Sequence, residues 1–208
     1  MGEITHGLRA VLSYSKMYDL FQGIMGAKKG RSIFSARYIR AKEGDRVLDI
    51  GCGTAETRDY LPAVEYYGFD PNPNYIRAAQ KRLRDVPGCT FLCAAIDEAV
   101  LGTLPKFDIV LALGVLHHLN DEAVVRLAKL AKVALKEKGR LILVDPCFVE
   151  GQSPVARFLA MVDRGQHVRD VKGYRDLVNT AFGDVHIEIR NDLIRFPYTH
   201  LIMECVAE

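Results

Sequence analysis

Two acids and two glycines in the first third of the chain have the types and spacing to hold a nucleoside. Asp49 lies in a short apolar run, and Gly51 and Gly53 follow that run directly. Nineteen residues after Gly51, a second apolar run ends in Asp70. Glycines let the backbone approach a ligand closely, and an acid at the end of the next strand can accept hydrogen bonds from both ribose hydroxyls. The spacing therefore predicts a turn that binds an adenosine-containing ligand.

The position three residues after the second glycine separates two such ligands. A dinucleotide fingerprint has a third glycine there, beside a pyrophosphate, whereas this chain has Glu56. A carboxylate would repel a pyrophosphate, but it is compatible with the sulfonium and α-amino groups of S-adenosylmethionine. From Val47 to Gly53 the chain resembles the first motif of the class I S-adenosylmethionine-dependent methyltransferases, V-L-D-x-G-C-G-T/P. The resemblance implies S-adenosylmethionine as cofactor and S-adenosylhomocysteine (SAH) as product, with cofactor contacts from Asp49, Gly51, Cys52, Gly53, Asp70 and Pro71.

The two acids have different expected partners. Asp49 lies inside a strand, where a carboxylate is costly to bury without partners. We expect it to face backbone N–H groups of the turn and, directly or through water, the ammonium of the cofactor. Asp70 is expected to bind the ribose, and the alternative is that it only starts a turn or caps a helix.

A pair of histidines follows the fourth expected strand. The segment from Leu113 to Leu119 reads L-G-V-L-H-H-L and resembles the segment that lies under the methionine end of the cofactor in the same family. The resemblance implies that Leu113 and Gly114 line the cofactor pocket with backbone groups. His118 is the better candidate to orient or deprotonate an acceptor, because an unperturbed imidazole titrates near neutrality. His117 is the second catalytic candidate, with capping of the following helix as its favoured alternative.

The expected adenine wall departs from the family pattern. The family often places an acid and then a small or apolar residue after the third strand, and here those positions hold Ala95 and Ile96. Ala95 cannot accept from the adenine amino group, so Asp97 or a backbone carbonyl would have to do so. Ile96 packs either on the adenine or in the core.

Acceptor specificity is expected from the two flanks of the chain. Tyr14 and Tyr18 belong to a segment that either covers the cofactor as a lid or packs against the sheet. The polar run over residues 163–170 lies where acceptor-binding insertions occur in the family, and a solvated loop is its alternative. The candidate acceptor-binding residues of this run and of the terminal hairpin are Arg164, His167, Arg169, Tyr198 and His200.

Alternating strand and helix patterns predict an α/β fold with a doubly wound, mostly parallel sheet. The resemblance implies seven strands in the order 3-2-1-4-5-7-6, ending in an antiparallel hairpin after N-terminal helices. We expect a helix from Asp121 to about Glu137, with Gly139 as its left-handed cap. The single domain divides into a helical lid (1–44), a cofactor-binding core (45–145) and an acceptor-binding segment with the terminal hairpin (146–208). The expected strands cover residues 47–50, 65–69, 90–94, 107–113, 140–144, 185–189 and 199–206.

Composition excludes several classes of protein. The 208 residues carry 28 basic and 26 acidic side chains, so no strong field attracts nucleic acid or a membrane surface. No run reaches the roughly 18 to 20 apolar residues of a membrane span. Five cysteines without a CxxC pair favour neither a disulfide framework nor a zinc site, and Cys89 and Cys93 are expected in the core. We predict a cytoplasmic monomer or homodimer without a metal site.

The expected reaction is methyl transfer by in-line displacement to a hydroxyl or amine of a small-molecule acceptor. Alignment of the reacting groups in a dry pocket supplies much of such catalysis. An NAD-type oxidoreductase is the first alternative, but it would need the third glycine. A nucleic-acid methyltransferase would carry an Asn/Asp-Pro-Pro-aromatic motif, and Asp145-Pro146-Cys147-Phe148 matches that motif only faintly. A non-catalytic protein that binds the adenosyl cofactor is the remaining alternative.

Overall fold

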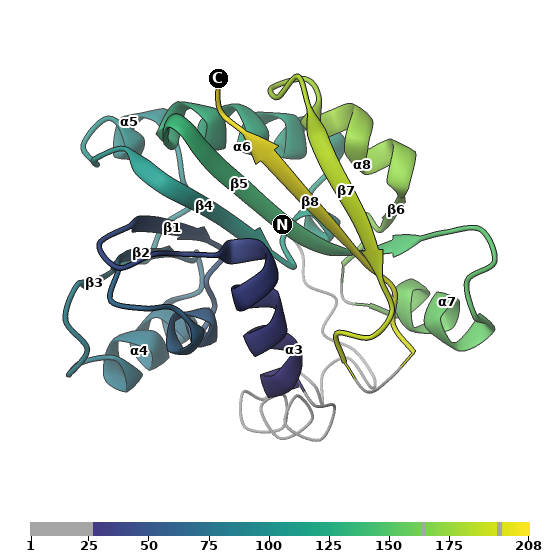
Figure 1. The fold of residues 1–208 in the computed structure, drawn as a ribbon, viewed down its shortest axis with the longest axis horizontal. Helices are drawn as coiled ribbons and strands as arrows, with labels where there is room; N and C mark the ends of the chain where they lie inside the picture. The colour runs from purple at the N-terminus through teal and green to yellow at the C-terminus, as the bar shows by residue number, and fades with distance from the viewer. Residues whose placement is uncertain (1–26, 164, 195–196) are drawn as a thin grey trace.

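The computed structural model describes residues 27–163, 165–194 and 197–208, whose strands form a mixed sheet (Figure 1). The strands are β1 (Arg46–Ile50), β2 (Glu65–Phe69), β3 (Cys89–Leu92), β4 (Phe107–Leu113), β5 (Leu135–Phe148), β6 (Arg169–Asp170), β7 (Val185–Arg190) and β8 (His200–Val206). They lie in the order β3-β2-β1-β4-β5-β8-β7, and β6 pairs with β5 off this path. Pairs from β3 to β5 are parallel, whereas β8 is antiparallel to β5 and to β7. With the two-residue β6 left out of the count, the expected order 3-2-1-4-5-7-6 is confirmed.

Helices cover both faces of this sheet, as Figure 1 shows. The helices are α3 (Ala27–Phe34), the π-helix η1 (Ser35–Ile39), the 3₁₀-helix η2 (Glu56–Tyr60), α4 (Pro73–Arg82), α5 (Glu98–Leu101), the 3₁₀-helix η3 (Leu116–His118), α6 (Asp121–Ala134), α7 (Pro154–Met161) and α8 (Val171–Val178). One core cluster joins the sheet to α5, α6 and α8, and the other joins it to α3, η1 and α4. In β4, Val110 and Ala112 belong to the first cluster and Ile109 and Leu111 to the second. Burial on both faces explains why this strand is apolar without interruption.

Side-chain caps start several helices where the sequence indicates. The Asn72 side chain accepts from the N–H of Asn74 at 2.9 Å, and Pro73 occupies the first turn of α4. The Asn120 side chain accepts from the N–H of Ala123 at 3.0 Å and begins α6. These caps satisfy N–H groups that have no partner inside the helix. Helix starts at the carboxyl edge of the sheet are therefore fixed by local sequence.

The expected boundary between α6 and β5 is wrong. The helix ends at Ala134, and Leu135 has an extended backbone and pairs with Phe107 of β4. Lys138, not Gly139, has the left-handed backbone, with a φ of 59°. A Cβ on Gly139 would lie 3.0 Å from the carbonyl oxygen of Phe107, so this glycine permits close packing and does not cap the helix. Pairing with β4 overrode the helical pattern here.

The expected core position is wrong for Cys93, whereas Cys89 packs against the core cluster of α3, η1 and α4. Cys93 is exposed and Cys89 is half-buried. The reason is topological, because β3 is the edge strand of the sheet and has only β2 beside it.

No helix within the described ranges is long and apolar enough to cross a membrane. Among those same residues no group of histidine, cysteine or acidic side chains is arranged to hold a metal ion.

Candidate active site

The turn after β1 has the backbone geometry that its glycines predict. Gly51 and Gly53 have φ values of +74° and +55°, which L side chains rarely adopt. The N–H groups of Gly51 and Cys52 both donate to the carbonyl oxygen of Phe69, at 2.7 and 3.0 Å. A Cβ on Gly51 would lie 2.6 Å from Cγ2 of Val115, whereas a Cβ on Gly53 would meet nothing within 4 Å. The first glycine therefore lets the loop after β4 pack closely, and the second leaves the backbone open to a ligand.

Asp49 is buried beneath this turn and faces a neutral partner. The Tyr66 hydroxyl donates to Oδ2 of Asp49, and the carboxylate is only 2% exposed. Burial raises the pKa of Asp49 to about 7, with a smaller contribution from the charge of Asp70, while the Tyr66 hydrogen bond opposes the rise. Burial likewise raises the pKa of the Tyr66 hydroxyl. A ligand ammonium would supply the positive charge that favours the ionised form of this carboxylate.

Asp70 connects the glycine turn to the loop after β2. Its Oδ2 accepts from the N–H of Gly53 at 3.0 Å, and its Oδ1 accepts from the N–H of Asn72 at 2.8 Å. The residue is 8% exposed. The turn-starting role that sequence offered as an alternative is therefore present, and it fixes the carboxylate beside the second glycine. A carboxylate oxygen has more than one lone pair, so these bonds leave acceptor capacity.

The neighbouring candidate residues lie around the same edge of the sheet. Gly114 has a φ of +70°, and its N–H donates to the carbonyl oxygen of Val144 at 2.7 Å. Leu113 is half-buried at the end of β4 and packs on the core cluster of α3 and α4. Cys52 is half-buried, and burial raises the pKa of its thiol. Pro71 is exposed after β2.

The expected adenine wall follows β3. Ala95 is exposed, and Ile96 is half-buried against the core cluster of α5, α6 and α8. The Asp97 side chain accepts from the N–H of Val100 at 2.8 Å and begins α5. The cap uses one oxygen of Asp97, so Asp97 and a backbone carbonyl both stay predicted acceptors for an adenine amino group.

His117 lies between two carboxylates that come from distant parts of the chain. Its Nδ1 is 2.6 Å from Oδ1 of Asp145 at the end of β5, and its Nε2 is 3.1 Å from Oδ1 of Asp163 after α7. Its backbone N–H also donates to Asp145, at 3.0 Å. Burial of the ring lowers its pKa, but Asp145 and Asp163 together raise the pKa of His117 to about 9.

The two carboxylates of this cluster have different surroundings. The Asp145 side chain is fully buried, which raises its pKa, while His117 opposes the rise. Burial also raises the pKa of Asp163, but hydrogen bonds from His117, the Gly165 N–H and the Tyr198 hydroxyl outweigh it and hold the pKa well below its usual range. The Tyr198 hydroxyl donates to Oδ2 of Asp163 at 2.9 Å. Sequence reasoning missed both acids, although an acid at the end of a parallel strand, as at Asp70, was a usable signal for Asp145.

The second histidine and the hairpin histidine have contrasting environments. His118 is half-buried, and its ring centroid lies 4.1 Å from that of His117. Burial lowers the pKa of His200 to about 4, so that imidazole is neutral at physiological pH. Its ring centroid lies 5.0 Å from that of Tyr198. His118 thus remains the candidate to face an acceptor.

Two of the candidate acceptor-binding residues bind the loop after β4. The Arg169 guanidinium donates to the carbonyl oxygens of Leu116, Leu119 and His167 and to Asp121, at distances of 2.7 to 3.1 Å. The N–H of His167 donates to the carbonyl oxygen of His117 at 2.9 Å. These contacts favour a structural role for Arg169. Tyr14, Tyr18 and Arg164 lie outside the described residues.

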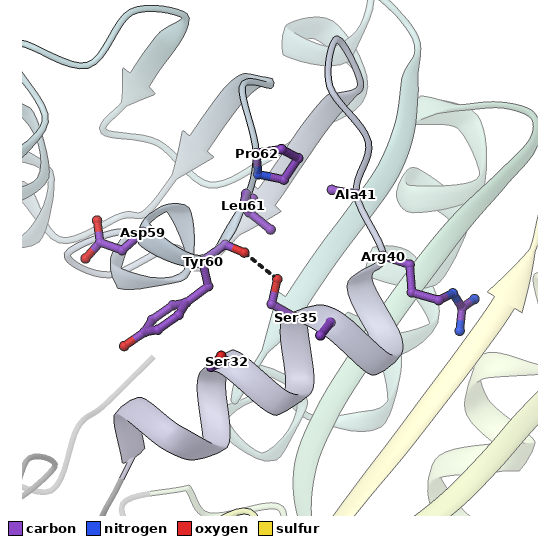
Figure 2. A pocket seen from close by; sticks show the side chains of 9 residues that line it. Ser32, Ser35, Arg40, Ala41, Asp59, Tyr60, Leu61 and Pro62 are labelled. Carbon is purple, nitrogen blue, oxygen red and sulfur yellow. Dashed lines mark hydrogen bonds between the residues drawn. The ribbon is translucent and has the colours of Figure 1, made fainter.

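A separate hollow of about 580 Å³ lies between α3 and η1 on one side and η2 and the segment after it on the other (Figure 2). In its wall the Ser35 hydroxyl donates to the carbonyl oxygen of Tyr60 at 2.7 Å. Of the residues expected to bind the cofactor, none of those that the structure describes lines it. The candidate site is therefore the carboxyl edge of β1, β2 and β4, and not this hollow.

Comparisons with known proteins agree with this geometry. Residues 48–141 match a family model described as a methyltransferase domain. The chain is 26% identical over 202 residues to phosphoethanolamine N-methyltransferase 1 of Zea mays, covering 92% of this chain and 38% of that protein. It is 33% identical over 88 residues to the ubiquinone biosynthesis O-methyltransferase of Azorhizobium caulinodans, covering 41% of this chain and 35% of that protein. The chain thus spans less than two fifths of the length of these curated relatives.

Solved structures share the fold. The pyocyanin biosynthetic protein PhzM superposes with a TM-score of 0.73 at 16% identity, covering 99% of this chain and 63% of that chain. The magnesium protoporphyrin IX methyltransferase of Synechocystis PCC 6803, solved with bound SAH, superposes with a TM-score of 0.66 at 20% identity, covering 95% of this chain and 97% of that chain. Residues 48–141 therefore match a methyltransferase domain, and the fold of the chain is that of solved methyltransferase structures. The prediction of the fold is confirmed, and the methyltransferase-domain match agrees with the predicted family and cofactor.

Proposed function

We propose that this chain transfers a methyl group from S-adenosylmethionine to a hydroxyl or amine of a small-molecule acceptor. The observation that carries the proposal is the pairing of an open left-handed turn at Gly53 with a buried carboxylate, Asp49, which accepts a hydrogen bond from the neutral Tyr66 hydroxyl. An adenosyl ligand with an α-ammonium complements both features. When bound, S-adenosylmethionine supplies an activated methyl group on a sulfonium.

Different residues of the chain then bind different parts of the cofactor. Backbone groups of Gly53 and Gly114 allow close approach of the cofactor, Gly51 lets the loop after β4 pack against the turn, and Asp49 attracts the ammonium. Asp70 accepts hydrogen bonds from the ribose hydroxyls. Leu113, Cys52 and Pro71 complete the walls, and Ala95 and Ile96 lie beside the adenine.

The remaining residues orient the acceptor. His118, beside the buried His117, directs or deprotonates an acceptor hydroxyl; an acceptor amine would need no base. The segment over residues 146–208 supplies the acceptor side of the site, with Tyr198, His167 and His200 as its candidate walls. The division into a lid (1–44), a core (45–145) and this segment belongs to the same proposal, as do the cytoplasmic location and the monomeric or homodimeric state.

The test is SAH formation by the purified protein with S-adenosylmethionine and a panel of small phenols, hydroxy acids and primary amines. We expect acceptor-dependent SAH release that falls by about tenfold or more in an Asp70→Ala variant at subsaturating cofactor, and by about 10²-fold or more in a His118→Gln variant for hydroxyl acceptors. Binding of SAH without turnover on any acceptor would favour the non-catalytic cofactor-binding protein. Reduction or oxidation with NAD would favour the oxidoreductase.

A further inference from the structure

The described residues around His117 form a small polar assembly at the carboxyl edge of β4 and β5. We call residues 165–169 the strap. The strap is preceded by Asp163 and lies on the loop after β4, where its backbone and side chains bind that loop at several points. A Cβ on Gly165 would lie 2.0 Å from Cδ2 of His117, so the strap contacts the imidazole directly and only glycine fits there. The Arg169 guanidinium binds the far end of the same loop.

Hydrogen-bond stoichiometry decides the state of His117. A neutral imidazole has one N–H donor and one acceptor, and an ionised carboxylate only accepts. Oxygens of Asp145 and Asp163 lie within hydrogen-bond distance of Nδ1 and Nε2 respectively. Both contacts are favourable together only when both ring nitrogens carry a proton. Asp163 also accepts from the Tyr198 hydroxyl and from the Gly165 N–H at 2.9 Å, which fits an ionised carboxylate.

Charge balance points to the same state. The Asp145 side chain is fully buried, and its Oδ2 has no hydrogen-bond partner within the part of the chain that the structure describes. An imidazolium at His117 supplies the opposite charge that a buried carboxylate requires. The other titratable or charged groups around the ring are His118 beside it, Tyr198 behind Asp163, Tyr174 near Asp145, and Arg169 on the strap.

We infer that His117 is a positioning residue and not the proton acceptor: as an imidazolium held between Asp145 and Asp163, it fastens the strap onto the loop after β4, and proton transfer falls to His118. The part of the inference that concerns proton transfer rests on the proposed function, whereas the protonation state of His117 is a property of the protein itself. With both nitrogens engaged, His117 has no lone pair to offer a substrate. By binding the strap, His117 holds Gly114 and the loop after β4 in place at the carboxyl edge of β1, β2 and β4.

The first test reads protonation without turnover. Long-range ¹⁵N NMR of the labelled full chain is recorded from pH 5 to 10, and the His117 signals are assigned by their loss in a His117→Gln variant. We expect two protonated ring nitrogens at pH 7 and a titration near pH 9 that moves to lower pH in Asp163→Asn. One protonated and one unprotonated nitrogen at pH 7 would overturn the inference. Because no acceptor is needed, failure to find a methyl-transfer reaction leaves this test intact.

The second test separates positioning from catalysis. With a hydroxyl acceptor, His117→Gln and Gly165→Ala should both raise the KM of the acceptor. In both variants kcat should still increase with pH over the acidic part of the pH profile, as it does in the parent. His118→Gln should lose that rise, and His186→Gln, at an exposed position on β7, should match the parent. If the acidic rise disappears in His117→Gln and persists in His118→Gln, His117 is the base and the inference is wrong. Gly165→Ala carries the test if His117→Gln does not fold.

Discussion

At the scale of residues, the buried carboxyl group of Asp49 links the stability of the protein to the proposed binding of the cofactor. Asp49 has a pKa raised to about 7 by burial, so its ionisation in the folded chain is disfavoured. For an acid whose folded pKa lies above its unfolded value, the cost to stability begins above pH 3.8 and is complete above about pH 7. The apo protein therefore holds an unfavourable charge at the position where the cofactor ammonium would bind.

An Asp49→Asn substitution should consequently stabilise the apo protein while weakening cofactor binding. The gain in free energy of unfolding should be largest at pH 8, at most about 4 kcal/mol, and should vanish near pH 4. Thermal denaturation at both pH values, with SAH titration at pH 8, checks both halves. Tyr66→Phe is the matched control, because it removes the hydroxyl donor and should destabilise the chain. Equal pH dependence of Asp49→Asn and the parent would contradict the assignment.

Residue patterns predicted the cofactor side of the site better than the acceptor side. The acids and glycines at Asp49, Gly51, Gly53 and Asp70 are local in sequence, and β1 and β2 bring them together by simple pairing. Asp163 meets His117 only through the path of the chain after α7, which no short motif encodes. Sequence reasoning for this reason named His117 but missed its partners.

At the scale of elements, α3 is held against the loop between β7 and β8. A Cβ on Gly30 would lie 1.8 Å from the carbonyl oxygen of Leu193. Arg31 forms an ion pair with Glu56, directly after the glycine turn. Helix α3 therefore contacts both the loop between β7 and β8 and the segment after the glycine turn.

Gly30→Ala should therefore separate α3 from this loop. Overpacking of this kind costs typically about 1 to 3 kcal/mol of stability. Chemical denaturation measures the loss, and Gly102→Ala is the matched control. A Cβ on Gly102 would lie 3.4 Å or more from its neighbours, and its backbone is right-handed helical, so that substitution should be close to neutral. A Gly30→Ala variant as stable as the parent would show that α3 does not pack in this way.

Elements with a strong periodic pattern were predictable, and their ends were less so. The bounds of β2 and β4 and the start of α6 agree with the sequence expectation. The end of α6 does not agree with the expectation. Leu135 fits both the apolar face of a helix and the pattern of a strand, and its pairing with Phe107 of β4 selects the strand. Boundaries of this type depend on neighbours in space, which periodicity does not contain.

At the scale of the whole molecule, the cluster around His117 couples stability to pH. A histidine whose folded pKa is raised contributes stability that is complete below pH 6.5 and is lost as the pH rises through about 9. We expect the free energy of unfolding of the parent to fall by up to about 3 kcal/mol between these values. Denaturant titrations at pH 6.5 and 9.5 measure it, and His117→Gln should show a much smaller change. A parent protein with a flat profile over this range would contradict the ion-pair cluster.

Calorimetry tests whether the carboxyl edge of β1, β2 and β4 binds an adenosyl cofactor. The parent protein and a folded Asp70→Ala variant are titrated with SAH, S-adenosylmethionine and NAD. We expect micromolar binding of both adenosyl ligands, a loss of at least about tenfold in the variant, and no binding of NAD, because the third glycine that a dinucleotide turn needs is replaced by Glu56. Binding of NAD in place of the adenosyl ligands, or equal binding by parent and variant, would contradict this expectation.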